Sequence, residues 1–102
     1  METHQFNSLF VTMNTLTREG YTEDFKAGEV KIKALYSKHE YQPKDLLIIE
    51  SYHFDKITNP ENDMQLFAIK ANDGIKGSLV MSYGAKHLQN MDLIKQIKER
   101  SD

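Results

Sequence analysis

Apolar residues recur at helical spacing near the start of the chain. They predict a helix from about Ser8 to Glu19, with an apolar stripe made of Leu9, Phe10, Met13 and Leu16. Gly20 then stands where many helices end in a left-handed residue, and Tyr21 would contact Leu16 in a Schellman motif. Ser8 is the expected N-cap, and Thr3 is the alternative for a longer helix.

The pattern of apolar and polar residues predicts the first two strands, the first by alternation and the second by a continuous apolar run. In Glu29–Tyr36, lysines alternate with apolar residues, and the side chains expected to face inward are Val30, Ile32, Ala34 and Tyr36. Leu46 to about Asp55 forms the second predicted strand. Its first half is apolar at every position, which indicates a central strand or one covered at that end. The polar segments Thr22–Phe25 and Ser37–Asp45 are expected to be connections.

Two further apolar runs, Leu66–Ile69 and Leu79–Met81, flank the sequence Asn72-Asp73-Gly74. An Asp-Gly pair between apolar runs is a strong signal for a β-hairpin, because glycine adopts the positive φ that the turn needs. Gly77, inside the fourth strand, predicts a bulge or a close backbone approach.

A second helix is expected from about Met91 to Arg100, with Asn90 as its cap and basic residues toward its end. The predicted fold class is therefore α+β: a four-stranded antiparallel β-meander with an N-terminal and a C-terminal helix packed on one face. Short connections favour sequential strand order.

Length and composition fit one domain over residues 1–102. Of the residues, 39% are apolar and 27% charged, and the net charge of −2 argues against a general nucleic-acid binder. The absence of cysteine excludes disulfides and thiolate metal sites. No apolar run reaches the roughly 18 residues of a membrane span, so no membrane partner and a cytoplasmic location are expected.

Candidate reactive groups are scattered. The histidines His4, His39, His53 and His87 lie far apart, the turn carboxylates do not match an EF-hand loop, and the glycines match neither a dinucleotide fingerprint nor a Walker loop. No catalytic residue, metal ligand or cofactor is predicted from them. Lys31, Lys33 and Lys38 indicate a basic sheet edge, which either prevents strand pairing or contacts phosphate. RNA binding is the least favoured alternative. The order of elements is similar to that of double-stranded-RNA-binding domains, but those carry a cluster of lysines at the start of the second helix, where this chain has only Lys86.

Aromatic residues are numerous for one small sheet face. Some are expected to line a groove or a self-association surface, and core-edge packing is the alternative. The residues concerned are Tyr21, Phe25, Tyr36, Tyr41, Tyr52, Phe54 and Tyr83.

Several stretches in fixed order resemble a family of short bacterial proteins of about this length. They are Arg18–Phe25, Tyr52–Asp55, Asn59–Asp63, Asp73–Gly77 and Tyr83-Gly84. Some members carry the name phosphoribosylpyrophosphate synthetase. True enzymes of that name are several times longer and resemble paired phosphoribosyltransferase domains with an acidic, Gly/Thr-rich ribose-phosphate loop, which this sequence lacks. The resemblance implies fold and kinship, with no activity and no catalytic residues to carry over.

Two functional hypotheses follow. The leading one is a non-enzymatic cytoplasmic module that acts by protein interaction or regulation, with a homodimer as one form. The alternative is a binder of a small ligand, phosphate and nucleotides among them, or a modest enzyme. Its pocket is expected where the turn Asn59–Asp63 meets the sheet, lined by His53, Asp55 and Tyr83.

Overall fold

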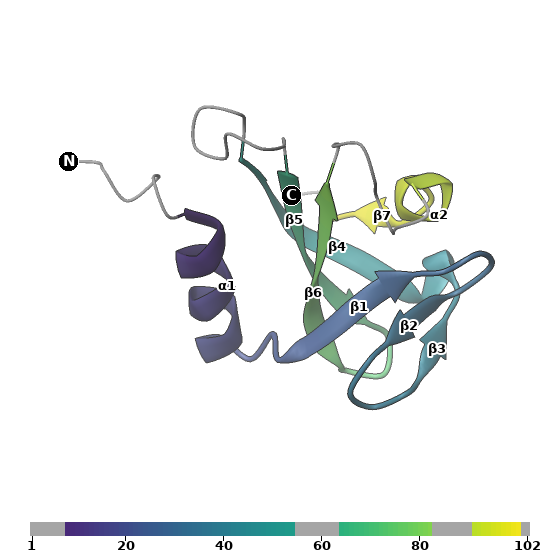
Figure 1. Ribbon diagram of the computed structural model, residues 1–102. Helices are drawn as coiled ribbons and strands as arrows, with labels where there is room; N and C mark the ends of the chain where they lie inside the picture. Colours follow the sequence, from purple (N-terminus) through teal and green to yellow (C-terminus); the bar gives the residue numbers. More distant parts are fainter. Residues whose placement is uncertain (1–7, 55–63, 83–90, 101–102) are drawn as a thin grey trace.

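The chain forms a strongly curled sheet with two short helices (Figure 1). The computed structural model describes residues 8–54, 64–82 and 91–100. Along the chain the elements are α1 (Ser8–Arg18), β1 (Glu23–Ala27), β2 (Ile32–Ala34), β3 (Glu40–Tyr41), the 3₁₀-helix η2 (Pro43–Asp45), β4 (Leu46–Phe54), β5 (Met64–Ala71), β6 (Lys76–Ser82), α2 (Met91–Lys95) and β7 (Lys98–Glu99). No helix in these ranges is both long and apolar enough to cross a membrane.

Helix α1 ends as its sequence predicts. Gly20 has a φ of +101°, the Tyr21 N–H donates to the Leu16 carbonyl at 2.9 Å, and the Gly20 N–H donates to Thr17 at 3.1 Å. These two bonds define a Schellman motif. Lys76 of β6 fixes the same end: its Nζ donates to the Glu19 carbonyl at 3.2 Å and lies 4.6 Å from the centre of the Tyr21 ring.

The predicted four-stranded antiparallel meander is wrong. Seven strands form one mixed sheet in the order β3-β2-β1-β6-β5-β4-β7, curled into a half-barrel. Two three-stranded antiparallel meanders, β1-β2-β3 and β4-β5-β6, make up most of this sheet. Strand β1 pairs in parallel with β6, and β7 pairs in parallel with β4, so sequential strand order fails at both places.

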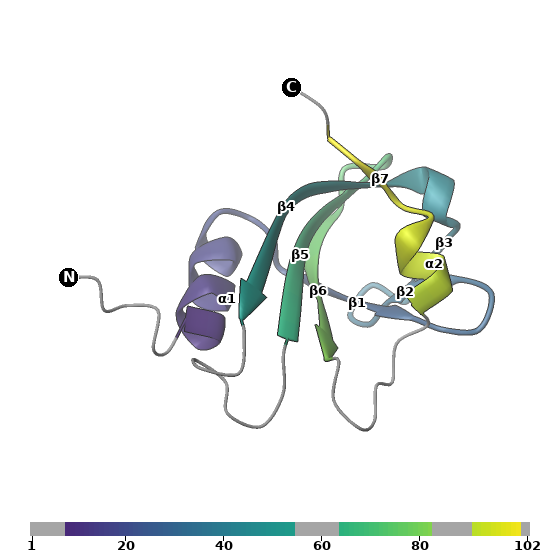
Figure 2. The same ribbon diagram turned by 90° about the horizontal axis from the view of Figure 1, so that it is seen from above.

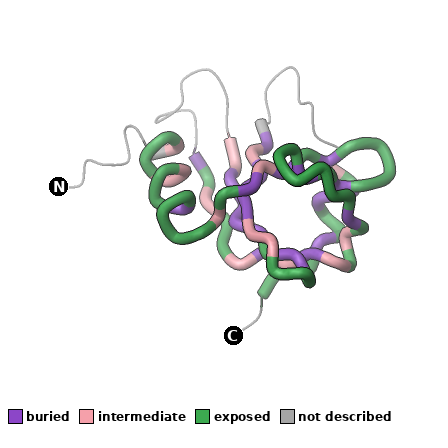
Figure 3. Tube along the Cα trace, turned by 90° about the horizontal axis from the view of Figure 1, so that it is seen from below, coloured by how far each residue is buried: buried purple, intermediate pink, exposed green. Residues whose placement is uncertain are grey.

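The two helices do not share a face of the sheet, which corrects the second part of the predicted fold. Figure 2 shows α1 outside the curl and α2 inside it. Leu16 of α1 packs with Phe54, Leu66 and Ala68 in an outer core, whereas Leu93 and Ile94 of α2 belong to a larger inner core. Each helix therefore covers part of one face of β4 to β6. Seen end-on in Figure 3, buried segments run around the ring of strands.

The strands at the sheet's margins are short, and several differ from the predicted elements. Strand β1 lies in the predicted connection, β3 lies in the predicted loop, and β7 replaces the end of the predicted second helix. Strand β2 is confined to Ile32–Ala34 because turns close on both sides of it. As a result Ile32 and Ala34 are fully buried, but Val30 and Tyr36 are 76% and 73% exposed and do not face inward.

Two predictions about turns and glycines are confirmed. The Gly74 N–H donates to the Ala71 carbonyl at 3.0 Å, and Gly74 has a φ of +97°, which closes the β5–β6 hairpin. Gly77 is a point of close backbone approach: a Cβ built there would lie 2.2 Å from the carbonyl oxygen of Glu23, its parallel partner on β1. Only glycine fits at this β1–β6 junction.

Candidate functional site

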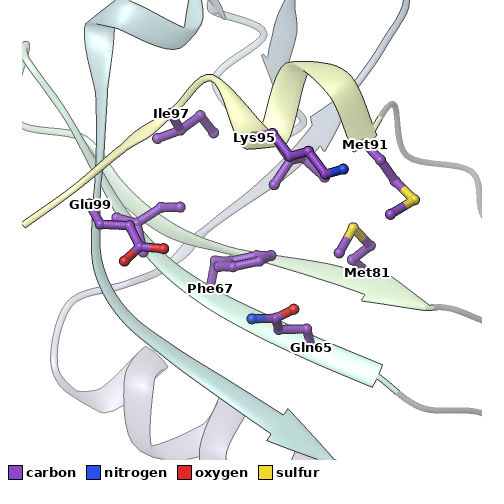
Figure 4. A pocket seen from close by; sticks show the side chains of 9 residues that line it. Gln65, Phe67, Met81, Met91, Lys95, Ile97 and Glu99 are labelled. Carbon is purple, nitrogen blue, oxygen red and sulfur yellow. The ribbon is translucent and has the colours of Figure 1, made fainter.

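The inner face of the curl contains a pocket of about 410 Å³ between α2 and the sheet. Figure 4 shows its lining: Phe67 and Gln65 come from β5, Met81 from β6, and Met91 and Lys95 from α2. The apolar lining residues are Ile48, Phe67, Met81, Met91, Ile94 and Ile97. Five of these six, all but Met91, are only 4–5% exposed, so the pocket lies inside the inner core.

The pocket exists because α2 is too short to fill the curl. With five residues it makes little more than one turn, and the chain then leaves it for β7. Protein interiors are normally packed without voids of this size. Met81 and Met91 point toward each other across the pocket in Figure 4, and methionine is flexible enough to adapt to different shapes.

Polar groups lie among the apolar lining. Gln65 reaches the pocket from β5, Lys95 from α2 and Glu99 from β7. Within the described ranges neither Lys95 nor Glu99 forms an ion pair. A mainly apolar pocket with a few polar groups is the usual form of a small-molecule site.

Of the three site residues predicted from sequence, one can be located. His53 is exposed on β4 and pairs in register with Gln65, which in turn pairs with Met81. Cross-strand partners project from the same face, so His53 shares the pocket's face, one strand beyond Gln65. Asp55, Tyr83 and the turn Asn59–Asp63 lie outside the described residues. That these groups form one site stays a prediction.

The two cores contain most of the aromatic side chains that suggested an interaction surface. Phe25, Tyr41 and Phe54 are at most 6% exposed. Tyr21 and Tyr52 are partly buried against the outer core. Tyr36 is exposed, and Tyr83 lies outside the described residues. In the described part of the chain, core packing therefore accounts for five of the seven aromatic residues.

A cluster of polar side chains joins β3 to the β5–β6 turn. The Tyr41 hydroxyl donates to Asp73 Oδ2 at 2.9 Å, and His39 Nδ1 lies 3.6 Å from the same oxygen. Burial, and then the hydrogen bond to the Asp73 carboxylate, raise the pKa of Tyr41 to about 12. A hydroxyl so hard to deprotonate is a poor base or nucleophile at neutral pH, and the contact serves to hold two parts of the sheet together.

Sequence patterns also missed a buried carboxylate, Glu23, at the start of β1. It is 7% exposed, and its Oε1 accepts the N–H groups of Asp24 and Tyr36 at 2.9 and 2.8 Å, while Oε2 accepts that of Ser37 at 2.9 Å. Burial alone would raise its pKa, but these backbone hydrogen bonds outweigh burial and hold the pKa below its usual value. The hydrogen-bond donors around it are backbone N–H groups and the Ser37 side chain, which indicates a structural role.

In the portion of the chain that the structure describes, no three histidine or acidic residues converge as metal ligands would. No protein-family model, no curated protein and no solved structure matches this chain.

Proposed function

We propose that the chain binds a small amphipathic molecule in the pocket between α2 and the curled sheet. The observation that carries this proposal is the pocket itself: about 410 Å³ of space lined by six apolar side chains and three polar ones. A ligand whose apolar part covers these side chains would remove apolar surface from water, and its polar group could meet Gln65, Lys95 or Glu99.

This proposal belongs to the alternative of the two functional hypotheses, a small-ligand binder, but it uses a different pocket from the one expected at the turn Asn59–Asp63. The protein-interaction hypothesis, including a homodimer, and a cytoplasmic location stay predictions. The resemblance to the short bacterial family likewise stays a prediction, and the pocket lends it no activity.

The first experiment is native mass spectrometry of gently purified protein, followed by titration with octanoate as a model amphipath. We expect a retained small molecule, or saturable octanoate binding with amide shifts at residues that line the pocket. Met91→Trp should fill the pocket from α2 and weaken octanoate binding at least tenfold, equivalent to about 1.4 kcal/mol. The matched control is Met13→Trp, which adds the same ring to the other helix, against the outer core.

Binding that Met91→Trp leaves unchanged, or that both variants weaken equally, would contradict this proposal. Circular dichroism of each variant verifies that the fold is retained. If native spectra instead show a dimer without bound mass and octanoate does not bind, the interaction hypothesis is favoured.

A further inference from the structure

A second hollow, of about 680 Å³, lies at the end of the curl where η2, the β5–β6 turn and β7 meet. The backbone holds these elements together: the Asn72 N–H donates to the Asp45 carbonyl at 2.9 Å. It is lined by Lys44, Asp45, Leu46, Leu47, Lys70, Ala71, Asn72, Asp73, Gly74 and Lys98. We call this hollow the lysine groove.

Register places two of its three lysines on one face of the sheet. Leu47 pairs with Lys70 of β5 on one side and with Lys98 of β7 on the other. Neighbouring strands lie about 4.8 Å apart, so the two lysine Cα atoms flank Leu47 at a separation of about 10 Å. Lysine side chains are long enough to converge above Leu47. Lys44 approaches from η2, so three different elements contribute an ammonium group.

Among the described residues, these ammonium groups have no partner within ion-pair distance. Over residues 8–54, 64–82 and 91–100, none of Lys44, Lys70 and Lys98 forms an ion pair or a side-chain hydrogen bond. Other basic residues do: Lys31 lies 4.0 Å from Glu40, and Arg100 lies 3.9 Å from Glu50. An anion that binds between the three groove lysines would gain favourable interactions with more than one ammonium group.

The two carboxylates of the groove accept hydrogen bonds from neutral donors, so they keep their charges and leave the groove with three ammonium groups against two carboxylates. Asp45 accepts the Gln42 N–H at 3.0 Å and the Asn72 side-chain amide at 3.4 Å. Asp73 accepts the Tyr41 hydroxyl at 2.9 Å and the Ile75 N–H at 3.1 Å. Each carboxylate oxygen therefore has a donor within the chain. The three lysines have no acceptor among the described residues, which leaves their N–H donors available to a ligand.

We propose that the lysine groove binds a small ligand carrying at least two negative charges, of the class of a diphosphate group. Two ammonium groups on one face and a third from η2 suit a compact polyanion, since lysine binds phosphate as a point charge from any direction. A long nucleic-acid track would need a wider basic surface, and the whole chain carries a net charge of −2. This site is separate from the α2 pocket, and the two proposals stand or fall independently.

The test is titration of the full chain with inorganic pyrophosphate at low salt, followed by amide chemical shifts and calorimetry. We expect the shifts to concentrate at residues 44–47, 70–74 and 98. The double variant Lys70→Ala/Lys98→Ala should weaken binding about tenfold. The control Lys26→Ala/Lys33→Ala removes two exposed lysines that are also cross-strand partners, on β1 and β2, and should change affinity by less than about twofold.

Equal weakening in both double variants would overturn the proposal, because overall charge would then explain the binding. Absence of binding, or shifts centred outside the groove, would overturn it as well. Tighter binding of a single-stranded oligonucleotide, with shifts along β1 and β2, would replace it with a nucleic-acid surface.

Discussion

Glu23 occupies a position that β1 would ordinarily give to an apolar residue. Its carboxylate lies beneath the turn that follows β2, where the backbone N–H groups of Tyr36 and Ser37 would otherwise be unsatisfied. A buried N–H without an acceptor costs about 1–3 kcal/mol, so one acidic side chain makes this turn possible. Among the described residues, hydrogen bonds stabilise this charge and no ion pair is formed by Glu23.

Replacing Glu23 by Gln should destabilise the fold by about 1–3 kcal/mol at pH 7, because an amide NH₂ would face backbone donors. The folded-state pKa of Glu23 lies below its ordinary value of 4.5. Its stabilising effect is therefore fully present above that value and is lost as the pH falls below it. Urea unfolding at pH 7 and pH 3.5 should show a smaller acid-induced loss for the variant than for the native chain.

Asp24→Asn is the matched control, since it removes a neighbouring charge. Burial, and then repulsion by Glu23, raise the pKa of Asp24. Its charged form thus disfavours folding, and the variant should be at least as stable as the native chain at pH 7. A loss of stability equal to that of Glu23→Gln would show that net charge matters and the hydrogen bonds do not.

Gly77 and Gly74 require glycine for different reasons: Gly77 for close backbone contact and Gly74 for its positive φ. Gly77→Ala should destabilise the chain by about 3 kcal/mol or more, because its Cβ would collide with the Glu23 backbone at the β1–β6 junction. Gly74→Ala meets nothing within 4 Å and should cost only about 1–2 kcal/mol, for the positive φ. Thermal unfolding of both variants tests this order, and a smaller effect at Gly77 would contradict the close approach.

Elements with strong patterns were predictable, and short ones were not. Strands β4, β5 and β6 carry long apolar runs, and the Asp73-Gly74 turn marks their second hairpin. Strand β1 has one large apolar residue, Phe25, and β3 and β7 have two residues each. Such strands exist through pairing with distant segments, which local sequence does not encode. Ile97 continued the helical period, yet it is buried beyond the end of α2.

Tyr41 links two elements that the sheet order leaves far apart, β3 and the β5–β6 turn. Tyr41→Phe should cost about 1 kcal/mol at pH 7 through loss of the hydrogen bond to Asp73. Burial, and then Asp73, raise the pKa of Tyr41 to about 12 from 10.0. The native chain therefore loses stability as the pH rises from about 10 toward 12, where only the unfolded chain ionises at this residue.

Urea unfolding at pH 7 and pH 11 tests this expectation. Between these two pH values, Tyr41→Phe should lose less stability than the native chain. The control is Tyr36→Phe, because Tyr36 is exposed and should show neither effect. Equal behaviour of the two variants would mean that Tyr41 does not hold the elements together.

At the scale of the molecule, the sequence held a signal for the true architecture. The run Leu46–Ile49 is apolar at every position, which indicates a covered strand, and Leu46 and Ile48 do lie in the inner core; α1 covers the outer face farther along β4, at Tyr52 and Phe54. The α2 pocket was not predictable, because it depends on how far α2 extends and how tightly the sheet curls. The lysine groove needed the parallel pairing of β4 with β7, and nothing local in the sequence indicates that register.

The β1–β6 junction has a consequence for the order in which the chain folds. The antiparallel neighbours β1-β2-β3 and β4-β5-β6 are joined by short-range contacts, whereas β1 and β6 come from opposite halves of the sequence and share two register pairs. Closing that long loop is entropically slow. We expect the units β1-β2-β3 and β4-β5-β6 to form first, and the pairing of β1 with β6 to follow as the last step. The lifetime of the native state would then depend on undocking at Glu23 and Gly77, so a ligand bridging the two units would slow unfolding and leave the folding rate nearly unchanged.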